Sequence, residues 1–115
     1  MGQREGSTPG RQSNVSPVRF HPAATAEAEA AVRWYNERVP GPGEDFRVET
    51  VRGVERIAEA PLRWPTSAYD PRARRFLVTR FPYSIVYVVA GDGGVVVAAV
   101  AHAKRRPAYW RTRVG

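Results

Sequence analysis

The sequence predicts an α+β fold in which a two-helix antiparallel hairpin packs on one face of a small sheet. Two long segments with helical periodicity come first, and three extended, β-branched segments follow in quick succession. Helices and strands that are segregated in this way form a helical layer on one face of an antiparallel sheet. We therefore expect an N-terminal strand, the helical hairpin and a three-stranded antiparallel meander, in that order.

The helical hairpin is predicted from two amphipathic segments. In the first, "AATAEAEAAVRWYNERV" (23–39), small and apolar residues recur every three or four positions, so one face is buried. "PGPG" (40–43) ends it, because proline removes a backbone donor and glycine accepts the conformation of a helix end. The second helix (44–60) begins with Glu44 and Asp45, whose charges suit the positive end of the helix dipole.

Strands are predicted on both sides of the hairpin. "VRFHP" (18–22) alternates apolar and polar residues and ends in a proline that suits the first turn of the first helix. The three extended runs span residues 75–81, 83–90 and 95–102, and "GDGG" supplies a tight hairpin between the last two. The final run, "VVVAAVA", also fits a buried helix. We expect the N-terminal strand to pair with a sheet edge and the face opposite the helices to stay open, with basic residues around it.

Length and composition indicate one domain. A chain of 115 residues, 43% of them hydrophobic, fits a single packed core. Residues 1–16 are rich in Gly, Ser, Gln and Pro and predict a flexible leader, which leaves 17–115 for the domain. No run reaches the roughly 18 apolar residues of a membrane span, and the N-terminus lacks the apolar centre of a signal peptide. No membrane partner is therefore expected, and the expected compartment is the cytoplasm.

The residue inventory narrows the chemistry. Without cysteine there is no disulfide and no thiol nucleophile, and two histidines alone argue against a structural zinc site, so neither a metal nor a cofactor is expected. Residues 61–115 carry ten Lys or Arg against two acidic residues, whereas residues 18–60 carry six Arg against eight acidic residues. A basic face of this kind predicts a polyanionic partner, such as RNA, DNA or an acidic protein segment, although a solubilising surface explains it equally well.

Four motifs follow one another along the chain. They are "AEAAVRWYNERVPGPGEDF" in the helical hairpin, "APLRWP" after it, "RRFLVTRFPYSIVYVV" in the first two meander strands, and "VVVAAVAHAKRRPAYWRTR" at the end. Together they resemble the RelE/ParE family of bacterial toxins from type II toxin–antitoxin systems, over about residues 18–114. The resemblance implies a growth-inhibitory toxin with an antitoxin as its partner. It also implies a target that is either DNA gyrase, as for ParE-like members, or the ribosome and its mRNA, as for RelE-like members.

The RelE-like alternative implies a metal-free ribonuclease in which the RNA 2′-hydroxyl attacks the adjacent phosphate. His102 is the candidate acid or base, because imidazole titrates near neutral pH. Arg80, Arg105, Arg106 and, as a weaker candidate, Arg75 are expected to hold the phosphate, and Tyr109 or Trp110 is a candidate to stack on a base. Each also has a structural alternative: His102 as a strand terminus, Tyr109 as an anchor on the core, and the arginines as solvated charges.

The ParE-like alternative implies a protein-binding surface, of which arginine, tyrosine and tryptophan are the usual anchors. The expected surface consists of Arg75, Arg80, Lys104, Arg105, Arg106, Tyr109, Trp110 and Arg113. The "PGPG" break, the "W-P" after the second helix and the "FPY" junction favour this alternative, and so does the absence of lysine from the predicted sheet. A degenerate toxin that only binds its antitoxin is the third possibility.

Overall fold

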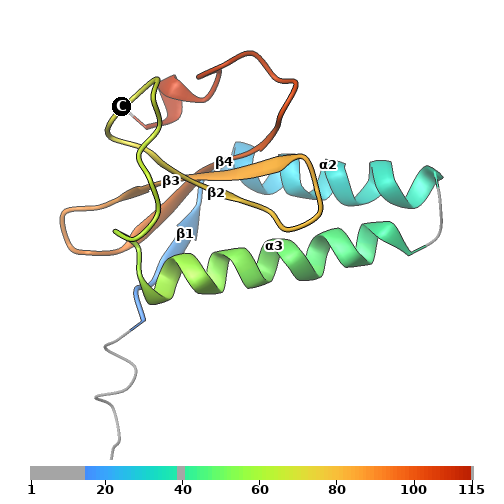
Figure 1. Ribbon diagram of the computed structural model, residues 1–115, viewed down its shortest axis with the longest axis horizontal. Coiled ribbons are helices and arrows are strands. Elements are labelled where there is room, and N and C mark those ends of the chain that lie inside the picture. Colours follow the sequence, from blue (N-terminus) through green and yellow to red (C-terminus); the bar gives the residue numbers. More distant parts are fainter. Residues whose placement is uncertain (1–14, 39–40, 115) are drawn as a thin grey trace, which may run out of the picture.

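A strand, a helical hairpin and a strand meander make up residues 15–38 and 41–114, the part of the chain that this computed structural model describes (Figure 1). The elements are β1 (Val18–Phe20), α2 (Pro22–Arg38), α3 (Pro42–Glu59), β2 (Arg74–Leu77), β3 (Tyr83–Val89), β4 (Val95–His102) and a 3-10 turn (Arg111–Arg113). The predicted α+β order is confirmed, and the last apolar run is a strand. The predicted leader lies outside the described residues except for Val15 and Ser16, and the Ser16 N–H donates to the Ala58 carbonyl at 3.0 Å.

The four strands form one mixed sheet in the order β1-β4-β3-β2. The last three are antiparallel neighbours, and β1 adds to the meander edge in parallel with β4, with Val18 opposite Val95. The first meander strand was predicted to run to residue 81, but β2 ends at Leu77. The chain turns there instead, because Arg80 takes a φ of 70° and the Val78 N–H already donates to the Tyr83 carbonyl at 2.9 Å.

A β-bulge interrupts β4 at Ala98. Val86 and Tyr87 are adjacent on β3, but their partners on β4 are Ala99 and Val97, so Ala98 is one residue extra. Before the bulge the outward backbone groups belong to Val95 and Val97, and from the bulge onward they belong to Ala98 and Val100. Because β1 pairs only as far as Val97, no strand in the described part of the chain neighbours the outer edge of β4 beyond the bulge.

The helical hairpin covers one face of the sheet, as predicted. α3 packs against β2 and β3, and α2 packs against β4. The hydroxyl of the fully buried Tyr87 donates to the Pro61 carbonyl, so its one polar group is satisfied.

Of the helices in the described residues, neither is long and apolar enough to cross a membrane. The largest fully buried side chains are Tyr87, Phe46, Ile57, Ile85, Val95, Val97 and Val100.

The opposite face of the sheet is not left open, contrary to the expectation from the sequence. The chain after β4 folds back across it, on the side away from α3 (Figure 1). Trp110, with 5% of its surface exposed, packs there with Ala73, Val86 and Ala99. The two alanines leave room for the large indole ring, whose burial offsets the entropy lost when the segment is fixed.

We expect the close approach of α3 to the sheet to fail when a side chain is added at Gly53. A Cβ there would lie 2.9 Å from side-chain atoms of both Ile85 and Phe76. Gly53→Val should therefore lower the free energy of unfolding by about 1–3 kcal/mol through overpacking, as measured by urea denaturation. Gly91→Ala is the control, since its new Cβ meets nothing within 4 Å. Equal losses in the two variants would contradict the close approach.

Candidate functional site

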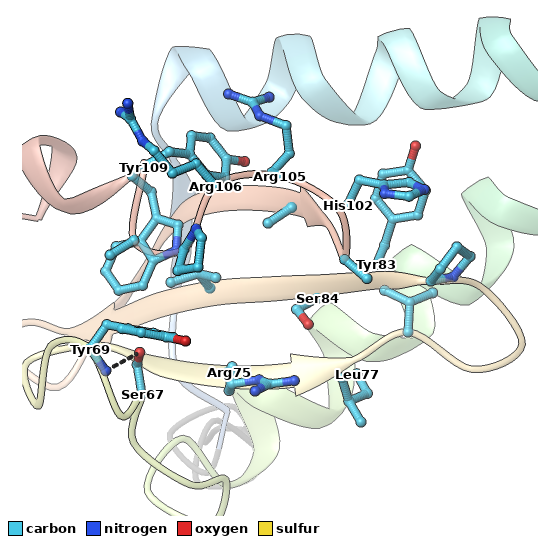
Figure 2. A pocket seen from close by; sticks show the side chains of 18 of the residues that line it. Ser67, Tyr69, Arg75, Leu77, Tyr83, Ser84, His102, Arg105, Arg106 and Tyr109 are labelled. Atoms are coloured by element: carbon cyan, nitrogen blue, oxygen red, sulfur yellow. Dashed lines mark hydrogen bonds between the residues drawn. The ribbon is translucent and has the colours of Figure 1, made fainter.

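An open groove of about 420 Å³ lies on the sheet face opposite the helices, beside the C-terminal segment (Figure 2). Leu77 and Tyr69 give it apolar surface, and their exposed fractions are 64% and 58%. Arg75, Arg105 and Arg106 line it as well. None of the described residues that line the groove is acidic, so its potential is positive.

Most of the residues predicted from the sequence meet at this groove. Lys104 lies in the same turn as Arg105 and has an exposed side chain. Arg80 and Arg113 do not line the groove. Those that line it are Arg75, His102, Arg105, Arg106, Tyr109 and Trp110.

Arg80 faces α3 instead. Its guanidinium Nη2 donates to Oε2 of Glu49 on α3 at 3.2 Å. The Arg80 side chain is 61% exposed, so the pair contributes at most about 1 kcal/mol to stability. Its charge is nevertheless directed to the helical layer rather than to the groove.

The hydroxyl of Tyr109 is held inside the protein. It donates to Oε2 of Glu27 at 2.9 Å, and the ring is only partly exposed. Burial, and then the hydrogen bond to Glu27, raise the pKa of Tyr109 well above its ordinary value. The hydroxyl therefore stays protonated at neutral pH and cannot act there as a base.

His102 closes β4 at the rim of the groove. Its Nδ1 accepts the N–H of Lys104 at 3.0 Å, which places the hydrogen of the neutral ring on Nε2. The ring packs edge-on against Tyr83, with centroids 5.0 Å apart. In this form His102 offers a hydrogen-bond donor, not a base, to a ligand.

Three exposed cations remain available to a ligand. Arg75, Lys104 and Arg106 form no ion pair with the residues that the structure describes. Arg105 is partly engaged, because it stacks 3.8 Å above the Tyr109 ring centroid and lies 3.8 Å from Glu27. Guanidinium groups bind carboxylates and phosphates through paired hydrogen bonds, so the groove can hold either type of anion.

Sequence reasoning missed the apolar part of the groove. Leu77 could have been found, because alternation along the strand places residues 75 and 77 on the face away from Phe76, which is buried under the helices. Tyr69 lies in an irregular loop that has no periodicity to read. Sequence reasoning also missed Glu27 and Asp70, the two carboxylates that bind the C-terminal segment.

Asp70 ties the loop before β2 to the C-terminal turn. Its side chain is 4% exposed, and it accepts hydrogen bonds from both the backbone and the guanidinium of Arg72. Nε of Arg111, in the 3-10 turn, lies 3.6 Å from Oδ2 of Asp70. The hydrogen bonds from Arg72 hold the pKa of Asp70 well below its ordinary range.

We expect acid to weaken this link. The folded-state pKa of Asp70 is lower than its unfolded value of about 3.9, so its contribution to stability is present above about pH 4. That contribution is lost as the pH falls through the folded-state pKa. Asp70→Asn should lower the melting temperature at pH 7, and its difference from wild type should shrink below pH 4 in circular dichroism melts. A difference that stays constant from pH 7 to pH 3 would argue against this role.

Comparison with known protein families assigns the chain to one of them. The family profile described as "ParE toxin of type II toxin-antitoxin system, parDE" matches residues 18–107. The chain belongs to the ParE toxin family. The match spans the hairpin, the sheet and the turn with Lys104, and it confirms the resemblance to the RelE/ParE family.

A solved ParE-type structure has the same fold. The protein described as "Chromosomal ParDE TA system from P. aeruginosa" aligns with a TM-score of 0.70, over 79% of this chain and 99% of that chain. The two sequences are 15% identical, so the likeness to that protein concerns the fold. No curated protein gives a significant match.

Proposed function

We propose that this protein is the toxin of a type II toxin–antitoxin pair and that it arrests growth by binding DNA gyrase through the groove. Its membership of the ParE family supports the first part. The observation that carries the second part is that three of the candidate catalytic groups are engaged in contacts within the protein. Tyr109 donates to Glu27, Arg80 pairs with Glu49, and Nδ1 of His102 accepts the N–H of Lys104. Metal-free RNA cleavage needs a base, an acid and cations around one phosphate.

The groove has the composition of a protein-binding site. Leu77 and Tyr69 supply exposed apolar surface beside the guanidinium groups of Arg75 and Arg106. Aromatic and arginine side chains of this kind are the usual anchors of protein interfaces. Their complement on the target is an acidic patch around an apolar residue, and binding should weaken as salt screens the charges.

An antitoxin is the second proposed partner. The groove is positive and partly apolar, which favours an acidic segment with apolar side chains. Such a segment would neutralise the rim and cover Leu77. It would also raise the apparent stability of the toxin, because it binds only the folded state.

Gyrase supercoiling assays test the proposed target. Arg75→Ala combined with Arg106→Ala should raise the half-inhibitory concentration by at least about tenfold, since truncation of one interface anchor commonly costs more than 1 kcal/mol. The matched control is Arg19→Ala combined with Arg33→Ala, which removes two exposed arginines from β1 and α2. We expect the control to change the value by less than about twofold. Equal effects of the two pairs would show that net charge, not the groove, carries inhibition.

Amine labelling gives an independent measurement of the same contact. Lys104 is the one lysine of the chain, so an amine-directed reagent labels it and the N-terminus. Bound gyrase should slow the labelling of Lys104 by about tenfold or more if the rim of the groove is covered. Unchanged labelling of a protein that inhibits gyrase would place the interface elsewhere.

Ribosome-dependent mRNA cleavage is the second candidate function. It is favoured by the position of His102, which lines the groove together with Arg75 and Arg106. Addition of the toxin to translating ribosomes separates the candidates. Under our proposal no cuts appear in the A site, whereas cuts that His102→Ala reduces about 100-fold would replace it with the nuclease. Antitoxin binding without either activity would identify a degenerate toxin.

A further inference from the structure

Glu27, in the second turn of α2, gathers donors from distant parts of the chain. Its side chain is 16% exposed. Oε1 accepts the backbone N–H of Val100 at 3.0 Å and Nη1 of Arg113 at 3.1 Å. Oε2 accepts the hydroxyl of Tyr109 at 2.9 Å and Nη2 of Arg113 at 3.1 Å. One carboxylate thus joins α2, β4 and the C-terminal segment.

Glu27 and Arg113 bind the backbone groups of β4 that a neighbouring strand would otherwise bind. Among the residues that the structure describes, no strand pairs with the outer edge of β4 beyond Val97. The Val100 N–H on that edge donates to Glu27, and the carbonyl of the bulged residue Ala98 accepts Nη1 of Arg113 at 3.1 Å. Buried backbone groups need hydrogen-bond partners, and the Glu27–Arg113 ion pair supplies one to each of these two groups at the bulge.

The same contacts hold the basic rim of the groove, which consists of Lys104, Arg105 and Arg106. Two guanidinium groups lie close to the Tyr109 ring, with Cζ of Arg105 at 3.8 Å and Cζ of Arg113 at 5.1 Å from its centroid. Trp110, the next residue, is buried on the sheet. Figure 2 shows Tyr109, Arg105, Arg106 and His102 along this side of the groove. Glu27 itself does not line the groove.

We propose that Glu27 is a positioning residue, whose charge fixes residues 103–114 against the sheet and so sets where Lys104, Arg105 and Arg106 meet a partner. The placement of the segment stands on the contacts above. The effect of this placement on gyrase inhibition rests on the proposed function.

A neutral amide cannot replace this carboxylate. Arg113, which can only donate, binds both Glu27 oxygens, so the NH₂ of a glutamine would face an Arg113 N–H whichever way it turned. The substitution would also leave Arg113, whose side chain is 18% exposed, without its counterion. Glu27→Gln, although nearly the same size, should therefore release the segment.

Amide hydrogen exchange followed by NMR tests the placement. In Glu27→Gln, the amides of Val100, Tyr109 and Arg113 should exchange about tenfold faster or more, while that of Ile85 in β3 stays unchanged. The unchanged Ile85 separates local release from general destabilisation. Glu29→Gln removes the same charge from an exposed position two residues along α2 and should leave all four rates unchanged. Wild-type exchange rates in Glu27→Gln would overturn the proposal.

A double-mutant cycle separates positioning through Arg113 from a general loss of stability. Glu27→Gln and Arg113→Gln should be strongly non-additive in the exchange rates, because either change removes the same ion pair. Additive effects would overturn the coupling. Tyr109→Phe keeps the carboxylate and removes one donor, so it should give a smaller acceleration and serves if Glu27→Gln does not fold.

The supercoiling assay tests the effect on binding. Glu27→Gln should raise the half-inhibitory concentration by about tenfold, and Glu29→Gln should not change it. If the wild type does not inhibit gyrase, the proposed function fails, and the exchange rates still judge the placement of the segment. If Glu27→Gln inhibits as well as the wild type although its segment exchanges faster, the role of Glu27 in binding is overturned.

Discussion

The arginine-rich C-terminal segment is held to the fold by two carboxylates from earlier parts of the chain. Glu27 of α2 binds Arg113, and Asp70 of the loop before β2 binds Arg72 and approaches Arg111. Both carboxylates are largely removed from solvent, where an unmatched charge would be costly, so each requires its cations. This pairing divides the positive charge of the chain into a part that builds the fold and a part that stays free for a partner.

The order of the elements and the α+β class could be predicted because they depend on local patterns. Helical periodicity, "PGPG" and "GDGG" each act within a few residues. An anchoring role for Tyr109 is among the alternatives that the sequence offers, but its partner Glu27 could not be predicted, since the two residues are separated by 82 positions and nothing near either one indicates the other. Arg80 shows the same limit. An arginine suggests an anion site, but the turn in which Arg80 lies directs its guanidinium to Glu49.

The candidate site illustrates how one fold serves different targets. The sheet and hairpin define the scaffold, and the likeness to a ParDE protein at 15% identity concerns that scaffold. What a groove on this sheet can do is decided by the few side chains beside it. Here an aromatic hydroxyl is committed to an internal carboxylate, and the arginines left free stand next to exposed Leu77 and Tyr69.

The side-chain pairing at the bulge also bears on self-association. An exposed strand edge is a template on which further chains can add and aggregate. On the β4 side, an incoming strand would have to expel both Glu27 and Arg113 from Ala98 and Val100. On the β2 side, Thr66 already bridges Arg74. Sheet extension is therefore hindered along β4 beyond Val97 and at the start of β2, so less of the strand edge is open to self-association.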